Sequence, residues 1–252
     1  MSDLRAFSSI REFILWRDSL DVAVGFVPTM GALHSGHSEL IKRSAAENKV
    51  SVVSIFVNPT QFNSQEDLQK YPRTLENDLD MAKTSGASAV LLPTFDEIYP
   101  DKYRYKLSES EFSKELCGAE RAGHFDGVLT VVMKLLQIVQ PQKAYFGEKD
   151  FQQLQLISDM VRAFFVRTEI VACSTVREAD GLAMSSRNVR LSSAGRELAP
   201  VLFRSLGAKT LAEARSALLS AGIEPEYLEE HYGRRFIAAF IDGVRLIDNV
   251  KL

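Results

Sequence analysis

Short apolar runs rich in β-branched residues alternate with helical segments along most of this chain, and this alternation constrains its fold more than any other feature. The runs at 23–27 and 50–57 have the composition of buried parallel strands, and between them Leu40, Ile41 and Ala45 recur at helical spacing. Two strands joined by a helix over this length form a βαβ crossover, which makes the strands parallel. Repetition of the unit predicts an α/β fold: a Rossmann-like open parallel sheet with helices on both faces.

The later elements divide the chain into two predicted domains. The alternation continues through helical patterns and apolar runs at 74–84, 89–92, 128–139, 144–146, 151–165 and 169–173. Beyond them the pattern changes to Ala/Leu/Arg-rich helices at 192–206 and 211–221, then to two β-like runs, 236–241 and 244–247. Asp242-Gly243 joins these runs and is a strong hairpin-turn signal. We therefore predict a Rossmann-like domain over residues 1–175 and a small C-terminal α+β domain over residues 176–252.

Composition excludes several classes of function. The 252 residues are 46% hydrophobic and 25% charged with a net charge of −3, which is typical of an ordinary globular protein and gives no sign of a nucleic-acid or membrane partner. Cys117 and Cys173 are too few for a disulfide framework or a zinc signature and indicate a reducing compartment. The N-terminal segment lacks a secretory apolar region, and no apolar run approaches the ~20 residues of a membrane helix. We expect a cytoplasmic protein.

A loop with two histidines follows the first predicted strand. In open α/β sheets, ligands bind beyond the carboxyl ends of the strands, where the next helix offers free N–H groups and the positive end of its dipole to phosphate. Gly31 and Gly36 let the backbone approach a ligand closely. His34 and His37 share one helix face and can donate hydrogen bonds to phosphate oxygens. The alternative is a plain turn whose histidines cap the helix, whereas a zinc site would lack a third ligand nearby.

Further polar side chains follow other predicted strands. The amides of Asn58 and Gln61 suit a small polar acid. Lys149 follows the run at 144–146, where its ammonium group can reach a phosphate, and Gln153 lies about one helical turn further on. Taken alone, Asn58-Pro59 is also typical of the start of a turn, and Gly147-Glu148-Lys149-Asp150 of a charged turn. Their occurrence together favours a nucleotide site beside an acid.

A third polar segment, at 176–188, combines two hydroxyl groups with a guanidinium group. Ser185, Ser186 and Arg187 are donors suited to the outer phosphates of a nucleotide. Composition alone also fits an interdomain linker.

Several of these segments resemble motifs of the pantothenate synthetase (pantoate–β-alanine ligase) family. They are VPTMGALHSGH at 27–37, VSIFVNPTQF at 53–62, FGEKDFQQ at 146–153 and VREADGLAMSSRN at 176–188. The H-x-G-H core is shared with the wider nucleotidylyl-transferase superfamily. The resemblance runs with gaps from about residue 25 to 191, and in the C-terminal part it rests mainly on 243–249. The stretch between Tyr227 and Phe236 looks shorter than in the family, as if a strand and a turn were missing.

The resemblance implies an enzyme that condenses (R)-pantoate with β-alanine, using ATP and Mg²⁺, to give pantothenate, AMP and pyrophosphate through a pantoyl-adenylate. It also implies a homodimer, and a C-terminal domain that acts as a lid. The implied catalytic residues are His34, His37, Lys149, Ser185, Ser186 and Arg187. The implied ATP-binding residues are Met30, Gly31, Ala32, Leu33, His34, Ser35, Gly36, His37, Gly147, Glu148, Lys149, Asp150, Val176, Met184, Ser185, Ser186 and Arg187.

The substrate and metal sites follow from the same resemblance. Pantoate would contact Met30, Asn58, Gln61, Val131, Val132 and Gln153. The two valines are equally well explained as core. Asp78 is the implied magnesium ligand and is equally well explained as a solvated helix acid. Two other functions stay open: a nucleotidylyltransferase that leaves AMP on its product, and a non-catalytic nucleotide-binding protein.

Overall fold

The computed structural model describes residues 4–252, which form two compact units. Of the described residues, the first unit comprises 4–147 together with Gln152–Cys173, and the second comprises Glu148–Phe151 and Ser174–Leu252. The predicted division after residue 175 does not anticipate that the short segment Glu148–Phe151 groups with the C-terminal residues.

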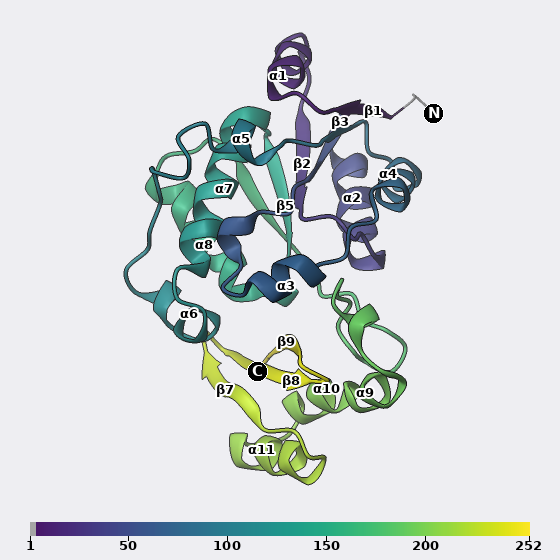
Figure 1. The fold of residues 1–252 in the computed structure, drawn as a ribbon, viewed down its shortest axis with the longest axis vertical. Helices are drawn as coiled ribbons and strands as arrows, with labels where there is room; N and C mark the ends of the chain where they lie inside the picture. The colour runs from purple at the N-terminus through teal and green to yellow at the C-terminus, as the bar shows by residue number, and fades with distance from the viewer. Residues whose placement is uncertain (1–3) are drawn as a thin grey trace. The chain divides into compact units, whose positions relative to one another are not determined.

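The first unit is built on a six-stranded sheet whose neighbouring strands are all parallel (Figure 1). In chain order its strands are β1 (Arg5–Phe7), β2 (Val24–Thr29), β3 (Val50–Ile55), β4 (Ala89–Leu91), β5 (Lys143–Gly147) and β6 (Glu169–Cys173). Their order in the sheet is β1-β4-β3-β2-β5-β6, so the direction of winding reverses between β2 and β5. Ligands of open α/β sheets bind at such a switch point. The predicted open parallel sheet is confirmed.

Helices cover both faces of this sheet. The longer ones are α1 (Ile10–Asp18), α2 (Ser35–Glu47), α4 (Leu75–Thr84), α7 (His124–Val139) and α8 (Phe151–Ala163). On one face, Ile41 of α2 and Ala82 of α4 pack in one apolar cluster with Val27, Val53 and Val90 of the strands. On the other face, α7 contacts β2 and is buried along most of its length. None of the helices in residues 4–252 has the length and apolar character needed to cross a membrane.

Shorter helical segments lie in the connections of the first unit. They are η1 (Pro59–Gln61), α3 (Gln65–Lys70), α5 (Phe95–Ile98), η2 (Phe112–Lys114) and α6 (Cys117–Glu120). Between β5 and α8, η3 (Glu148–Asp150) is a single turn that belongs to the second unit.

The second unit packs three helices against a three-stranded antiparallel sheet. These elements are α9 (Ser193–Leu198), α10 (Pro200–Leu206), α11 (Leu211–Ser220), β7 (Pro225–His231), β8 (Arg234–Ile241) and β9 (Val244–Lys251), and η4 (Asn188–Arg190) precedes them. Leu206, Leu218, Ile237 and Leu246 contribute to its core. The predicted α+β character is confirmed. One helix predicted at 192–206 is two helices, because Pro200 begins α10.

The C-terminal sheet confirms the predicted hairpin and contains a second one. Asp242 and Gly243 join β8 to β9 with φ values of 52° and 71°, as the tight turn requires. In the stretch between Tyr227 and Phe236, which looks shorter than in the family, β7 pairs with β8 through a second tight turn at Tyr232 and Gly233, with φ values of 50° and 66°. The sequence PEYLEEH of β7 contains no apolar run, so it gave no strand signal.

Candidate active site

The loop between β2 and α2 places the rings of His34 and His37 beside each other at the start of α2. Their ring centroids are 4.1 Å apart. Nδ1 of His34 accepts the backbone N–H of Gly36 at 3.1 Å, and Nδ1 of His37 accepts the backbone N–H of His34 at 3.3 Å. This reciprocal arrangement satisfies two of the N–H groups that a helix start leaves unpaired. The histidines therefore do cap the helix, as one interpretation of the sequence held.

Capping also determines which ring nitrogen can meet a ligand. Because Nδ1 of each imidazole accepts a backbone N–H, the proton of the neutral ring is on Nε2. An Nε2–H group is a hydrogen-bond donor, which is the kind of group that stabilises negative charge on phosphate oxygens. The capping role is thus compatible with a role toward phosphate.

Asp78 of α4 holds the same loop through its backbone. Its carboxylate is 2% exposed and accepts three hydrogen bonds: from the N–H of Ala32 at 2.9 Å, the N–H of Leu33 at 2.8 Å and the hydroxyl of Thr74 at 3.0 Å. Gly31 and Ala32 have positive φ values of 80° and 48°, a conformation in which successive N–H groups form an anion-binding concavity. The chain's own carboxylate fills this concavity, so Ala32 and Leu33 do not offer these N–H groups to a nucleotide.

These contacts favour a supporting role for Asp78 over the predicted magnesium role. A buried carboxylate with three donors has little capacity left for a metal ion. Among residues 4–252, no cluster of three or more His, Cys, Asp or Glu side chains is placed to hold one. The magnesium role of Asp78 stays a prediction.

Asn58 and Gln61 differ in what their side chains can do. Asn58 is fully buried: its Nδ2 donates to the carbonyl of Gly127 at 3.2 Å, and its Oδ1 accepts from Thr60 and from the hydroxyl of Tyr99 at 3.1 Å. It therefore fixes η1 on α7. Gln61, the last residue of η1, has a side-chain amide that bonds to no other residue of 4–252. Of the two, Gln61 has an amide available to a substrate.

Two residues outside the prediction hold Gln61 in place. The carbonyl oxygen of Gln61 lies 2.9 Å from Nη2 of Arg121 and 2.8 Å from Nδ1 of His124, at the start of α7. The side chains of Arg121 and His124 also contact each other at 3.1 Å. The stretch 118–127 is rich in glycine and polar residues, and nothing in its sequence identifies Gln61 as the partner.

The other predicted pantoate residues lie in two helices and a loop. Val131 and Val132 of α7 are each 5% exposed, which fits core packing. Gln153 of α8 and Met30 after β2 are half-buried.

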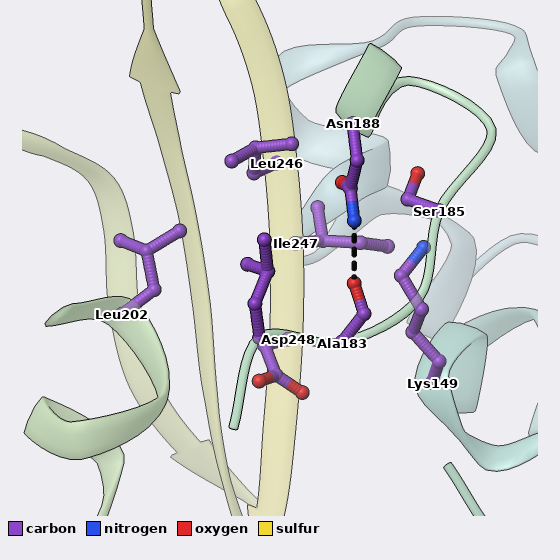
Figure 2. A pocket seen from close by; sticks show the side chains of 9 residues that line it. Lys149, Ala183, Ser185, Asn188, Leu202, Leu246, Ile247 and Asp248 are labelled. Atoms are coloured by element: carbon purple, nitrogen blue, oxygen red, sulfur yellow. Dashed lines mark hydrogen bonds between the residues drawn. The ribbon is translucent and has the colours of Figure 1, made fainter. Parts of the chain in front are cut away.

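The second unit brings Lys149 and Ser185 to one small pocket (Figure 2). Asn188 lines it as well, beside an apolar wall of Leu182, Ala183, Leu202, Leu246 and Ile247. Nδ2 of Asn188 donates to the carbonyl of Ala183 at 3.1 Å, while its buried Oδ1 has no partner among residues 4–252. A buried acceptor of this kind normally bonds to a water or a ligand. The lining therefore combines this apolar wall with polar groups of Lys149, Ser185, Asn188 and Asp248.

The segment that carries Ser185, Ser186 and Arg187 is held by backbone pairing before these three residues. Met184 donates its N–H to the carbonyl of Val176 at 3.0 Å, and Arg177 pairs with Ala183 in an antiparallel bridge. Within the loop, Oγ of Ser185 accepts the N–H of Arg187 at 3.2 Å. Lys149, on η3, is mostly buried and lies 3.9 Å from the carboxylate of Asp150.

Comparison with known proteins gives one consistent result over the whole chain. A family model described as pantoate-beta-alanine ligase matches residues 3–251. Curated relatives named pantothenate synthetase include one from Bdellovibrio bacteriovorus, 55% identical over 242 residues and 96% of each chain, and one from Legionella pneumophila, 48% identical over 252 residues, which are 99% of this chain and 100% of the relative.

Solved structures agree. A pantoate-beta-alanine ligase from Francisella tularensis, complexed with beta-gamma ATP and beta-alanine, has a TM-score of 0.94 and 42% identity and covers 99% of this chain and 98% of its own. A pantothenate synthetase from Thermus thermophilus has a TM-score of 0.92 and 40% identity over 98% of this chain and 99% of its own.

Proposed function

This chain belongs to the pantoate-beta-alanine ligase family and uses ATP to join pantoate to β-alanine, and we propose that it does so through a pantoyl-adenylate held by the residues described above. The observation that carries the assignment is the match of the family model to residues 3–251, which contain the paired histidines and Lys149. Direct amide formation from a carboxylate would require oxide to leave, so the acid needs activation first.

In the first step, a pantoate carboxylate oxygen attacks the α-phosphorus of ATP. A new P–O bond forms, the bond to the β-phosphate oxygen breaks, and pyrophosphate leaves with the electron pair. Negative charge grows on the phosphate oxygens, so hydrogen-bond donors and cations stabilise the transition state. The Nε2–H groups of His34 and His37, the ammonium of Lys149 and the side chains of Ser185, Ser186 and Arg187 are donors of this kind.

In the second step, the β-alanine amine attacks the acyl carbon of the adenylate. The C–N bond forms, the C–O bond to AMP breaks, and the amine loses a proton. No covalent bond to the protein is required, so positioning and charge stabilisation account for catalysis. Water would destroy the adenylate, which supports the predicted lid role of residues 176–252.

The pantoate contacts belong to the same proposal. The available amide of Gln61 and the half-buried Gln153 would bond the hydroxyl and carboxylate groups of pantoate. Met30 would lie nearby, whereas Asn58, Val131 and Val132 would act by supporting η1 and α7.

Magnesium, the homodimer and the cytoplasmic location are proposed on general grounds. Mg²⁺ is bound in nucleotide sites mainly by substrate phosphates and water, which fits a chain without an acidic cluster among residues 4–252. No step above is assigned to it. Cys117 and Cys173 are buried and form no disulfide, which fits a reducing compartment.

The test is AMP release with ATP, Mg²⁺, pantoate and β-alanine, omitting one component at a time. We expect release only with the complete mixture, and pyrophosphate without β-alanine only up to one equivalent. His37→Ala and Lys149→Ala should abolish pyrophosphate release in folded protein. AMP retained on the product, independent of β-alanine, would indicate a nucleotidylyltransferase instead.

A further inference from the structure

Asn249 of β9 holds the turn that carries Lys149. The side chain is 3% exposed, and its Nδ2 donates to the backbone carbonyls of Glu148 and Lys149, each at 2.9 Å. An amide NH₂ group has two hydrogens, so both are used on consecutive carbonyls of η3. The backbone of η3 is thereby fixed at the residue that bears the ammonium group.

Arg234 of β8 adds a second support to the same turn. Its Nη1 donates to Oδ1 of Asn249 at 2.6 Å, and its Nη2 lies 3.1 Å from the carboxylate of Glu148. Its guanidinium carbon lies 4.2 Å from the ring centroid of Phe151, a cation–π distance. One arginine therefore orients the Asn249 amide and contacts the residues on either side of Lys149 and Asp150.

Strand β9, which contains Asn249, is bonded to Arg177, at the start of the segment that carries Ser185, Ser186 and Arg187. Arg177 makes a bidentate pair with Asp248, at 2.6 and 3.0 Å, and also donates to the carbonyl of Asn249 at 3.4 Å. Arg177 is the residue that bridges to Ala183, two positions before Ser185. Lys149 and the Ser185–Arg187 stretch thus share one support in β9.

We propose that Asn249 is a positioning residue for Lys149 in the adenylation step, with Arg234 fixing the orientation of its amide. The inference rests on the proposed role of Lys149 toward ATP. A lysine side chain has four rotatable bonds, so a fixed backbone is the main means of placing its ammonium group. Misplacement of a catalytic group by about 1 Å reduces the rate about 100-fold. Asn249 touches no reacting atom and acts only through the turn.

The test separates the two half-reactions. Asn249→Asp keeps an acceptor for Arg234 and removes both donors to η3. We expect pyrophosphate release to slow about 10- to 100-fold. Pantothenate formation from supplied pantoyl-adenylate and β-alanine should stay near the wild-type rate, because no phosphoryl bond breaks in it. Asn48→Asp is the matched control: it removes two amide donors, to Ser44 and Tyr145, each at 2.8 Å, and should leave both half-reactions near wild type.

Arg234→Lys covers the case in which Asn249→Asp does not fold. Lysine keeps the positive charge but lacks the guanidinium group whose two nitrogens contact Asn249 and Glu148. Pyrophosphate release should therefore slow by a smaller factor than in Asn249→Asp. Equal slowing of both half-reactions in folded protein would show a purely structural role and overturn the proposal, as would unchanged pyrophosphate release in Arg234→Lys. Unchanged pyrophosphate release in Lys149→Ala would instead refute the proposed role of Lys149 toward ATP. The proposal for Asn249 rests on that role.

Discussion

His37 combines two functions that a substitution can separate. Its Nδ1 accepts the N–H of His34, and its Nε2 is the proposed donor to phosphate. In His37→Asn the amide oxygen can occupy the Nδ1 position, so the cap survives while the Nε2 donor is lost. In His37→Gln the amide nitrogen reaches the Nε2 position.

We expect His37→Asn to fold with nearly unchanged stability and to lose about 100- to 1,000-fold in kcat for adenylation. His37→Gln should retain more activity than His37→Asn. Urea denaturation and pyrophosphate release measure the two effects. A greater kcat in His37→Asn than in His37→Gln would contradict the Nε2 assignment.

Substitution of Asp78 can distinguish a metal ligand from a loop support, because the two roles respond differently to loss of the charge. Asp78→Asn leaves one acceptor for the N–H groups of Ala32 and Leu33 and removes the charge. Hydrogen bonds to a buried carboxylate contribute more than neutral ones, so the free energy of unfolding without any ligand should fall by about 2 kcal/mol.

Magnesium distinguishes the two roles in the same variant. If Asp78 supports the loop, raising the Mg²⁺ concentration should not restore kcat. Restoration of kcat by Mg²⁺, with unfolding unchanged, would support the predicted metal role.

Residue types near strand ends made part of the site predictable. His34 and Lys149 come shortly after strands, at the edge where open α/β sheets bind ligands, and this order was visible in the sequence. The supporting contacts were not visible. Asp78 bonds to residues about 45 positions earlier and Asn249 to residues 100 and 101 positions earlier, and sequence periodicity reports only on neighbours.

Among the elements, Gly127 shows how closely α7 approaches η1. A Cβ added there would lie 2.4 Å from the carbonyl oxygen of Thr60, which immediately precedes Gln61. Gly127→Ala should therefore displace η1, destabilise the fold by about 1–3 kcal/mol and raise the KM for pantoate more than that for ATP.

Gly207→Ala is the matched control. Gly207 ends α10 with φ of −80°, and an added Cβ would meet its nearest atom, the carbonyl oxygen of Arg204, at 3.5 Å. Its stability should be unchanged or slightly raised. Equal destabilisation of both variants would argue against close packing of α7 on η1.

Glu47, the last residue of α2, ties this helix to β5 and predicts a pH dependence. Its carboxylate bonds to Lys143 at 2.9 Å, Arg43 at 2.9 Å and the Tyr145 hydroxyl at 3.0 Å. The hydrogen bond from Lys143, then that from Arg43, lowers the pKa of Glu47 from 4.5 to about 2. A lowered native pKa stabilises the fold above the unfolded value of 4.5, and this stabilisation disappears as pH falls toward 2.

Glu47→Gln should thus lower the free energy of unfolding by about 1 kcal/mol at pH 7. The difference from wild type should narrow as pH falls below about 4.5. Glu39→Gln, which removes an exposed pair with Lys42, should have almost no effect at any pH. Urea denaturation from pH 7 to 3.5 measures the free energy of unfolding of both variants. If the difference between wild type and Glu47→Gln became larger on acidification, this would contradict the lowered pKa of Glu47.

Element prediction succeeded where burial leaves a pattern. Strands β2 to β5 are largely buried because both faces of the sheet are covered, and each was found in the sequence. The edge strand β6 was found as well, from its apolar residues Ile170, Val171 and Ala172. The three residues of β1 and the acidic β7 carry no such pattern, because β1 lies at the sheet edge and much of β7 is polar. β1 and β7 are strands because they pair with β4 and β8, and their own sequences do not indicate it.

Over the whole chain, sequence order and spatial grouping differ for one short segment. The predicted boundary between residues 175 and 176 rests on the change from βα alternation to Ala-rich helices, and the second compact unit resumes at Ser174. Glu148–Phe151 directly follows β5 and includes the first residue of α8, so chain order assigned it to the first unit. Its grouping with the second unit follows from side-chain bonds to Asn249 and Arg234, which no local pattern records.

The placement of Lys149 in one unit and His37 in the other makes nucleotide binding the decisive whole-molecule measurement. If both residues serve one ATP, calorimetry with a non-hydrolysable analogue should find one site per chain. His37→Ala and Lys149→Ala should each weaken that site by about 10-fold or more, since each removes a hydrogen bond to a charged group worth about 1.5 kcal/mol or more. The stoichiometry should not change, and Glu39→Gln should bind as wild type does. Two classes of site, with each substitution eliminating only one, would mean that the units bind nucleotide independently, and the adenylation mechanism would then lack either its histidines or its lysine.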